Sequence, residues 1–278
     1  MIGRATAALW AGPRRWIIRL WGVPDINTRQ KWHAAWPHLA RLPKHGICLL
    51  DAGCGEGTWS LELAARRPEW AVVGVDRELA PTERAERARR SLGLSNLTFA
   101  RADFLEFRPA RPFDAVLSIA SAHYLVADGR GAQLFRACSG WLRPGGVLVL
   151  LVPRPRDEVP CAPFLPAPFQ LRDVVSGDML RKLCVSGGLE VDSLAPVVGR
   201  FGTWAKQLSV LVCGSRPFRA LTYPLQLALV GLDRLTVRYG VRRSACWLLV
   251  ARRRVSAGRP AARRGGLQTD LRCDTISS

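Results

Sequence analysis

Short apolar runs separated by glycine, proline and polar segments pattern the first half of the chain. Five runs of mostly apolar residues stand out, at 47–50, 71–75, 97–100, 113–119 and 147–152. Runs of this length predict strands that are buried on both faces of a sheet. Segments expected to be helical lie between them, at 59–65, 82–92 and 133–141. Alternating strands and helices predict a sheet with helices on both faces.

The pattern changes after the fifth run. Repeated prolines predict an irregular loop over 153–168. A helix is expected at 178–186, an edge strand at 189–198 and a last strand at 244–251. Between the last two strands, residues 201–241 are apolar but are interrupted by charged residues and prolines, so no segment there is long enough to span a bilayer. We expect two apolar helices that either cap the sheet or lie on a membrane.

Composition and charge limit the classes of protein. The chain has 278 residues, of which 48% are hydrophobic and 23% charged, as in globular proteins. Its formal net charge of +19 comes almost entirely from arginine and predicts attraction to nucleic acid or to an anionic membrane surface. The eight cysteines form no C-x-x-C pair, so we interpret them as reduced thiols of a cytosolic protein, and we expect no metal site.

The N-terminal residues 1–24 contain no acid and interleave arginine with tryptophan and aliphatic residues. Three interpretations compete: a transit peptide, a helix at a membrane surface, or a helix that packs on the following domain. Residues 25–42 add a helix with Trp32, Trp36 and Leu39 on one face. We therefore place a basic, helical N-terminal extension at 1–42.

The chemistry centres on the segment between the first strand and the first helix. Asp51 ends the predicted strand, and Gly53, Gly55 and Gly57 follow at alternate positions. A dinucleotide fingerprint needs its third glycine at position 58, which is Thr58 here, and no Gly-Lys-Ser/Thr ending of a P-loop is present.

This Asp-x-Gly-x-Gly-x-Gly segment resembles the first motif of the class I S-adenosylmethionine-dependent methyltransferases. The resemblance implies that the backbone of Gly53, Cys54, Gly55 and Gly57 approaches the methionine part of the cofactor, with Asp51 near its ammonium group. A carboxylate suits a ligand that carries a sulfonium and an ammonium but no phosphate. The start of the following helix can face the methionine carboxylate.

Further motifs extend the resemblance. Asp76 ends the second strand, where a carboxylate can accept hydrogen bonds from both ribose hydroxyls, and Arg77 lies beside it. Asp103 and Phe104 resemble the turn that contacts adenine in the family. Ser118 lies in the fourth strand, at the end of which the transferable methyl group faces the acceptor in the family, so the resemblance implies that Ser118 contacts the cofactor. Leu-x-Pro-Gly-Gly at 142–146 resembles the turn before the fifth strand of the family.

One catalytic candidate follows the fourth strand. His123 matches the histidine of a Glu-His pair that is common in quinone and small-molecule O-methyltransferases of this family. Ala122 replaces the glutamate, which makes metal-assisted chemistry less favoured and puts the acceptor class in doubt. A histidine has a suitable pKa for a general base. The alternative is that His123 packs or contacts the cofactor.

The resemblance implies a Rossmann-like, doubly wound, seven-stranded sheet with the order 3-2-1-4-5-7-6 and an antiparallel last strand. We place this domain at 43–254, with the helical insertion at about 201–241, and expect the basic tail 255–278 to be disordered.

The expected function is transfer of a methyl group from S-adenosylmethionine to an oxygen of a small, lipidic or glycan-linked acceptor. We expect the protein in the cytoplasm, or peripheral on a membrane. An RNA methyltransferase is an alternative, less favoured because Ser118–Ser121 lacks the Asn/Asp-Pro-Pro-Tyr motif and the paired cysteines of base-methylating members. A non-catalytic binding module with the same fold is a second alternative, and the intact Asp51, glycines and Asp76 argue against it.

Overall fold

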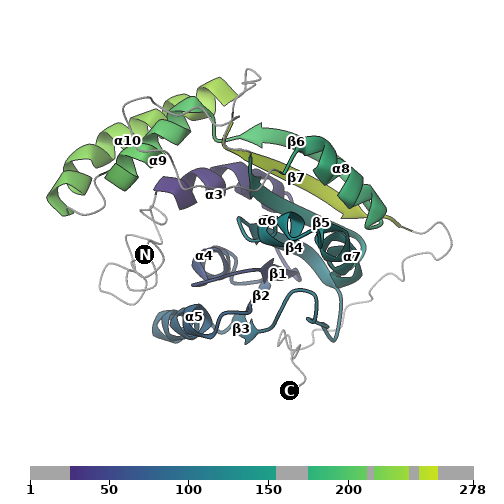
Figure 1. Cartoon of the computed structure of the whole chain (residues 1–278). Helices are drawn as coiled ribbons and strands as arrows, with labels where there is room; N and C mark the ends of the chain where they lie inside the picture. Colours follow the sequence, from purple (N-terminus) through teal and green to yellow (C-terminus); the bar gives the residue numbers. More distant parts are fainter. Residues whose placement is uncertain (1–25, 155–174, 212–215, 238–243, 256–278) are drawn as a thin grey trace.

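Seven strands form one sheet with the order β3-β2-β1-β4-β5-β7-β6 in the computed structural model, which describes residues 26–154, 175–211, 216–237 and 244–255 (Figure 1). The strands are β1 Cys48–Ala52, β2 Ala71–Asp76, β3 Leu97–Arg101, β4 Phe113–Ile119, β5 Leu142–Pro153, β6 Leu189–Val197 and β7 Cys246–Arg253. The helices are α3 Ile26–Leu39, α4 Thr58–Arg66, α5 Leu79–Leu92, α6 His123–Ala127, α7 Gly131–Trp141, α8 Gly177–Ser186, α9 Arg200–Leu211 and α10 Arg216–Val237.

The pairing of the strands confirms the predicted fold. The pairs β1–β2, β1–β4, β2–β3 and β4–β5 are parallel, and β7 pairs antiparallel with both β5 and β6. The carboxyl ends of β1, β2, β3 and β4 therefore meet at one edge of the sheet. In open sheets of this kind that edge is where ligands bind.

Two apolar layers hold the helices on the sheet. On one face, Trp59 and Leu63 of α4 and Ala88 of α5 pack with Leu49 of β1 and Val149 of β5. The tryptophans of α3 join this layer, because Trp32 stacks on both Trp36 and Trp59 with ring centroids 5.1 Å apart in each pair. On the other face, α6, α7 and α8 cover β4 and β5. Figure 1 shows the resulting three layers, with α4 and α5 apart from α7 and α8.

The structure differs from the sequence prediction at several element ends. The strand β1 does not end before Asp51 but continues to Ala52. The segment 142–146, predicted as a turn, is part of β5, with an irregular register where Gly145 takes φ +77°. The helix α5 begins at Leu79, before Pro81, since proline is tolerated in a first helical turn. The five-residue helix α6 was not predicted.

Two helices occupy the predicted insertion, α9 and α10, and they lie together above α3 in Figure 1. Asp233 of α10 is buried and accepts a hydrogen bond from the backbone N–H of Gly199 at 2.9 Å, just before α9. Gln30 of α3 donates to the carbonyl of Gly202 at 2.8 Å. A carboxylate at a helix N-terminus satisfies amide groups that have no partner within the helix. These contacts fix the insertion on α3.

Among the helices of the described residues, none has the length and apolar content needed to cross a bilayer. The interpretations of 1–24 and of the tail after Val255 fall on residues outside the described ranges, as does most of the predicted loop at 153–168.

Candidate active site

The glycine loop after β1 lies against the end of β4. Gly53 takes φ +78°, and a Cβ atom added there would lie 2.4 Å from Cβ and Oγ of Ser121. Ser121 donates a hydrogen bond to the carbonyl of Ala52 at 3.1 Å and shares one of 2.8 Å with Ser118. Ala120 turns the chain towards this contact with φ +57°, which costs a residue other than glycine about 1 kcal/mol or more. Only glycine fits at position 53.

Asp76 connects the glycine loop to the end of β2. Its carboxylate accepts the backbone N–H of Gly55 at 2.8 Å and that of Glu78 at 3.0 Å. The backbone N–H groups of Gly53 and Cys54 also donate to the carbonyl of Val75, at 2.8 and 3.1 Å. A carboxylate has about four acceptor positions, so Asp76 retains capacity for the two hydroxyls of a ribose.

Asp51 lies beneath the loop and is almost fully buried. Its carboxylate accepts a hydrogen bond from Ser60 Oγ of α4 at 2.6 Å. Burial raises the pKa of Asp51 to about 7, and the negative charge of Asp76 adds to the rise. The two acids therefore lie close enough to interact, as a shared cofactor site requires. A nearby cationic ligand would favour the ionised form of Asp51.

Asp103 and Phe104 follow β3, next to Asp76. The carboxylate of Asp103 accepts the backbone N–H of Leu105 at 2.8 Å, and its carbonyl accepts the N–H of Phe107 at 2.9 Å. This local turn holds Phe104, whose ring meets the edge of Trp141 with centroids 6.2 Å apart. The carboxylate of Asp103 and the ring of Phe104 thus lie side by side in the sequence at the carboxyl end of β3.

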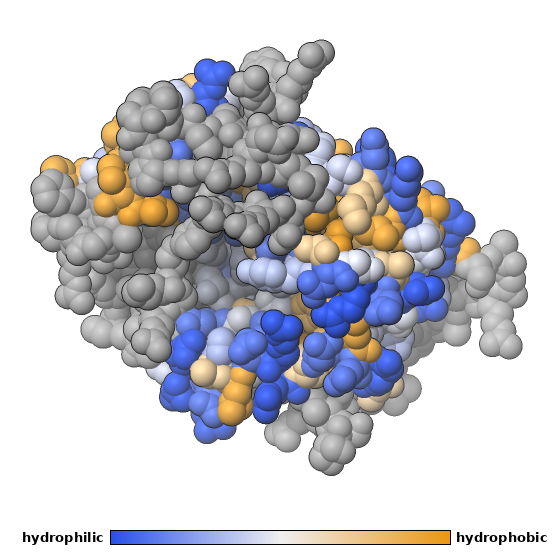
Figure 2. Space-filling model, in the orientation of Figure 1, coloured by the Kyte–Doolittle hydropathy of each residue, from blue (hydrophilic) through white to orange (hydrophobic). Residues whose placement is uncertain are grey.

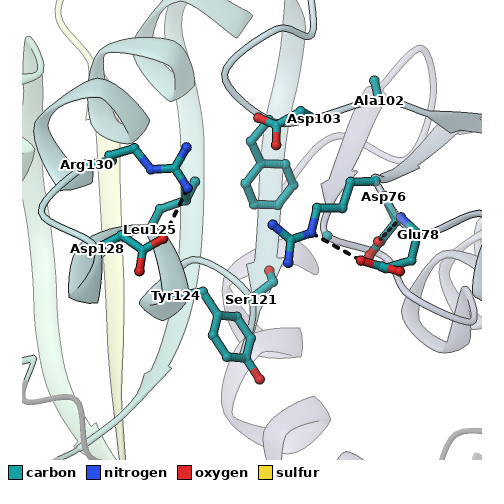
Figure 3. A pocket seen from close by; sticks show the side chains of 12 residues that line it. Asp76, Glu78, Ala102, Asp103, Ser121, Tyr124, Leu125, Asp128 and Arg130 are labelled. Carbon is teal, nitrogen blue, oxygen red and sulfur yellow. Dashed lines mark hydrogen bonds and ion pairs between the residues drawn. The ribbon is translucent and has the colours of Figure 1, made fainter.

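These elements surround a cavity of about 420 Å³ at the carboxyl ends of the strands. Its lining comes from four segments: Gly53 after β1, Asp76–Glu78 at the end of β2, Ala102–Phe104 after β3, and Ser121, Tyr124, Leu125, Asp128 and Arg130 around α6. Figure 3 shows Asp76 and Glu78 on one side of the cavity and Asp128 and Arg130 on the other.

The charges of this lining suit a cation. Four carboxylates face only two guanidinium groups, which are themselves paired: Arg77 with Glu78 at 3.3 Å and Arg130 with Asp128 at 3.1 Å. S-adenosylmethionine carries a sulfonium, an ammonium and one carboxylate, so its net charge is positive.

Phe104, Leu125 and Tyr124 supply an apolar wall for an adenine ring, and Asp76 supplies the acceptor for a ribose. Gly57, the N-cap of α4, has no side-chain cap, which leaves amide groups of the first turn for a carboxylate. The residues fit this cofactor.

The cavity brings together Gly53, Asp76, Arg77, Asp103 and Phe104 of the predicted cofactor residues. Asp51, Cys54, Gly55, Gly57 and Ser118 are not part of its lining, and their contact with the cofactor stays a prediction. Gly57 has another evident use, because a Cβ atom there would lie 2.5 Å from the Phe99 ring. Burial raises the pKa of the Cys54 thiol well above its ordinary value, so the thiol stays neutral.

Sequence reasoning did not assign Ser121, Tyr124, Leu125, Asp128 or Arg130 to the site. Only the Asp128-Gly129 pair, which is typical of turns, signals in the sequence that the chain reverses there. In the structure Gly129 takes φ +76°, and Asp128 and Arg130 on either side of it line the cavity. No group of three His, Cys, Asp or Glu side chains within the described ranges is arranged to hold a metal ion.

His123 is the first residue of α6 and is buried, 4% exposed. Its ring lies 4.0 Å, centroid to centroid, from that of Tyr124, which lines the cavity while His123 does not. The role of His123 as general base stays a prediction. An acceptor would reach Tyr124 before it reached the imidazole.

Comparison with known proteins agrees with this geometry. Residues 49–146 match a family model described as a methyltransferase domain. The chain is 35% identical over 135 residues to a trans-aconitate 2-methyltransferase of Azoarcus sp. (strain BH72), covering 48% of this chain and 49% of that protein. It is 33% identical over 127 residues to ribosomal RNA small subunit methyltransferase G of Alkalilimnicola ehrlichii, covering 45% and 54%. The chain thus spans about half the length of the curated relatives it matches.

A solved structure, geranyl diphosphate C-methyltransferase of Streptomyces coelicolor A3(2) in complex with S-adenosyl-L-homocysteine, superposes with a TM-score of 0.55 at 18% identity, covering 81% of this chain and 80% of that one. At this identity the likeness shows the fold. Residues 49–146 thus match a methyltransferase domain, and the sheet order is that of the class I methyltransferase fold. S-adenosylmethionine is the cofactor that the lining of the cavity fits.

The raised pKa of Asp51 predicts a pH-dependent stability. In the unfolded chain Asp51 ionises near pH 4, whereas in the folded protein it holds its proton until about pH 7. Stability from this group is therefore complete below pH 4 and is lost as the pH rises to about 7. Asp51→Asn keeps an acceptor for Ser60 and removes the titration. Urea unfolding at pH 5 and pH 8 should show a larger loss of stability in the wild type than in Asp51→Asn. Equal losses would contradict the assignment.

Asp76 should matter for cofactor binding far more than its neighbour. Asp76→Asn weakens an acceptor of both ribose hydroxyls, so we expect the Kd for S-adenosylhomocysteine to rise about tenfold or more. Glu78→Gln removes the same charge from the same cavity, at a side chain that is 64% exposed, and should change the Kd less than about twofold. Titration calorimetry on both variants, with thermal melting as a check of folding, makes the comparison. Equal changes in Kd would mean that Asp76 contributes only its negative charge and does not bind the ribose hydroxyls.

Proposed function

We propose that this protein transfers the methyl group of S-adenosylmethionine to an oxygen of a small, lipidic or glycan-linked acceptor at a membrane surface. The observation that carries methyl transfer is the net-negative cavity at the carboxyl ends of β1 to β4, closed by Gly53, Asp76 and Asp103. S-adenosylmethionine supplies an electrophilic methyl group on a sulfonium. The matched relatives are named for acceptors as different as trans-aconitate and ribosomal RNA, so the acceptor must be argued from this chain's own surfaces.

The chain's contribution to the reaction is chiefly positioning. Methyl transfer is an in-line displacement, for which close and aligned reactants supply much of the rate. Ser121 and the left-handed Ala120 hold the end of β4 against the glycine loop, which fixes this part of the cavity wall. Tyr124 is 61% exposed at the cavity and offers a hydroxyl that can hydrogen-bond an acceptor oxygen. An acceptor that is already an anion needs no general base.

The surface of α10 supports a membrane location. Leu221, Leu225, Leu232 and Leu235 are 75%, 56%, 46% and 60% exposed. Their spacing of four, seven and three residues places them along one helix face about 21 Å long. The only acid in α9 and α10 is the buried Asp233, whereas both helices carry basic residues. An exposed apolar face with cations and no exposed acid is typical of helices that lie on anionic lipid.

The helices that carry this face join the sheet at the edge where the cavity lies. The end of β6, the start of β7 and the end of β5 pair at the carboxyl edge of the sheet, and α9 and α10 connect β6 to β7 from that edge. Figure 2 shows apolar surface, in orange, where these helices reach the left of the view. A membrane-bound acceptor would therefore be presented on the side of the molecule where the cavity opens.

An acceptor screen tests the reaction. The protein is incubated with methyl-tritiated S-adenosylmethionine and with lipid, glycan and RNA fractions. We expect label in the lipid or lipid-linked glycan fraction, and none with Gly53→Ala, whose added Cβ overlaps Ser121. Label in the RNA fraction would support the RNA methyltransferase alternative, which the match to a ribosomal RNA enzyme favours. Cofactor binding without transfer to any fraction would favour a binding module.

Vesicle flotation tests the role of α10. In Leu225→Glu/Leu232→Glu, two carboxylates replace apolar contacts worth roughly 1.5 kcal/mol or more each, so binding to phosphatidylglycerol vesicles should fall at least tenfold. Val185 on α8 is 52% exposed and supplies the matched control, because Val185→Glu adds the same type of charge to an exposed apolar position elsewhere. Binding that survives the α10 variant, or that Val185→Glu abolishes equally, would show that α10 does not carry the interaction.

A further inference from the structure

A second concave surface lies at the other edge of the sheet. It is a groove of about 690 Å³ formed by the loop after β3, the outer side of α7 and the end of β7. The starts of β4 and β5 meet there, since Phe113 pairs with Leu142, and the guanidinium of Arg253 donates to the carbonyl of Leu142. The groove is thus separated from the cofactor cavity by the segment that begins at Asp103.

Four arginines and no acid line this groove: Arg108, Arg111, Arg136 and Arg253. Arg108 donates to the carbonyls of Leu105 and Phe107, at 2.7 and 3.1 Å, and so bonds to neutral acceptors. In the described part of the chain no carboxylate forms an ion pair with Arg108, Arg136 or Arg253. Asp114, at the start of β4, pairs with Arg143 instead.

This arrangement differs from the other basic parts of the chain. On α5, Arg87, Arg89 and Arg90 are paired with glutamates of the same helix, as on an ordinary solvated face. The groove takes its guanidinium groups from three separate elements, and among the described residues no carboxylate is ion-paired with Arg108, Arg136 or Arg253. A polyanion bound in the groove would be attracted by this concentration of positive charge.

The lining indicates which anion fits. Guanidinium groups bind phosphate oxygens through paired hydrogen bonds, and four of them along one open groove match a ligand with repeated charges. The aromatic residues of the groove, Phe107 and Trp141, are 6% and 3% exposed, so they offer no face on which a base could stack. Pro109 and Pro112 lack backbone N–H groups, which reduces the capacity of this loop to pair with a peptide strand. Recognition would therefore depend on phosphate and not on base sequence.

A membrane is the less suitable partner for this groove. The apolar face of α10 belongs to the carboxyl edge of the sheet, whereas the groove lies at the amino edge of β4 and β5. Arg108, Arg111 and Arg136 are exposed without any large apolar side chain of the lining exposed beside them to insert into lipid. A protein held on lipid by α10 would leave the groove open to solution.

We propose that the groove lined by Arg108, Arg111, Arg136 and Arg253 is a binding site for a run of phosphate groups, supplied by the backbone of single-stranded RNA or by a free polyphosphate. The site is separate from the cofactor cavity, and it does not depend on the acceptor assigned above.

Gly140 provides a test that leaves the arginines in place. It lies on α7 in the lining of the groove, and a Cβ atom added there would meet nothing within 4 Å. Gly140→Glu places a carboxylate among the four guanidinium groups, and Gly140→Gln fills the same space without charge. Fluorescence anisotropy with a labelled 12-nucleotide oligouridine, with tripolyphosphate as competitor, measures binding to the full chain.

We expect the Kd for oligouridine to rise about five- to tenfold in Gly140→Glu and to stay within about twofold of the wild type in Gly140→Gln. In Arg136→Gln the slope of log K against log salt should become shallower by about 0.7, the value for one phosphate contact on a single strand. Arg181→Gln, an equal loss of charge on α8, should leave the slope unchanged. Displacement by tripolyphosphate at similar concentration would identify free polyphosphate as a sufficient ligand, and binding of oligouridine alone would identify the RNA backbone.

Three results would overturn the proposal: equal binding of RNA by wild type and Gly140→Glu, an equal loss in Gly140→Gln, or loss of vesicle binding in Gly140→Glu with RNA binding unchanged. The first result would mean that RNA binds to other basic segments. The second would mean that the added bulk, and not the added charge, blocks binding. The third would mean that the groove binds lipid. None of these results bears on methyl transfer, which the cofactor titrations test separately.

Discussion

The close contact between Gly53 and Ser121 is the constraint on which the rest of the site depends. It brings the loop after β1 against the end of β4, at a distance that admits no Cβ atom. Asp76 then binds the same loop from β2 through the amide of Gly55. Three strand ends are thereby connected by short-range contacts, and the cavity between them takes its shape from the backbone. A methyl transfer that depends on alignment needs such a rigid frame.

The two ends of the sheet carry different electrostatics. The cavity at the carboxyl edge has an excess of carboxylates, whereas the groove at the amino edge has four arginines and no acid. A net charge of +19 would by itself suggest an evenly basic protein. The structure instead combines an anionic cavity with a cationic groove, and the loop from Asp103 to Pro112 contributes residues to both. The apolar face of α10 adds a third kind of surface at the carboxyl edge.

Much of the fold followed from sequence because each central strand is a short apolar run that ends in a polar residue. Asp76 and Asp103 were located for the same reason, since Asp76 directly follows one such run and Asp103 lies three residues after the end of another. The contribution of α6 was missed because a helix of five residues has too few turns to show a periodicity. The burial of Asp51 was also missed, since β1 continues past it to Ala52. The arginine groove was not predictable because its residues come from three segments that are distant in the chain, and only the sheet register brings them together.

The central claim is that the cavity between the ends of β1, β2 and β4 binds S-adenosylmethionine with its ribose on Asp76. A crystal structure of the protein with S-adenosylhomocysteine tests it most directly. The account predicts both ribose hydroxyls within about 3 Å of the Asp76 carboxylate and the adenine between Phe104 and Leu125. A ligand bound elsewhere, or in this cavity with its ribose turned away from Asp76, would contradict it.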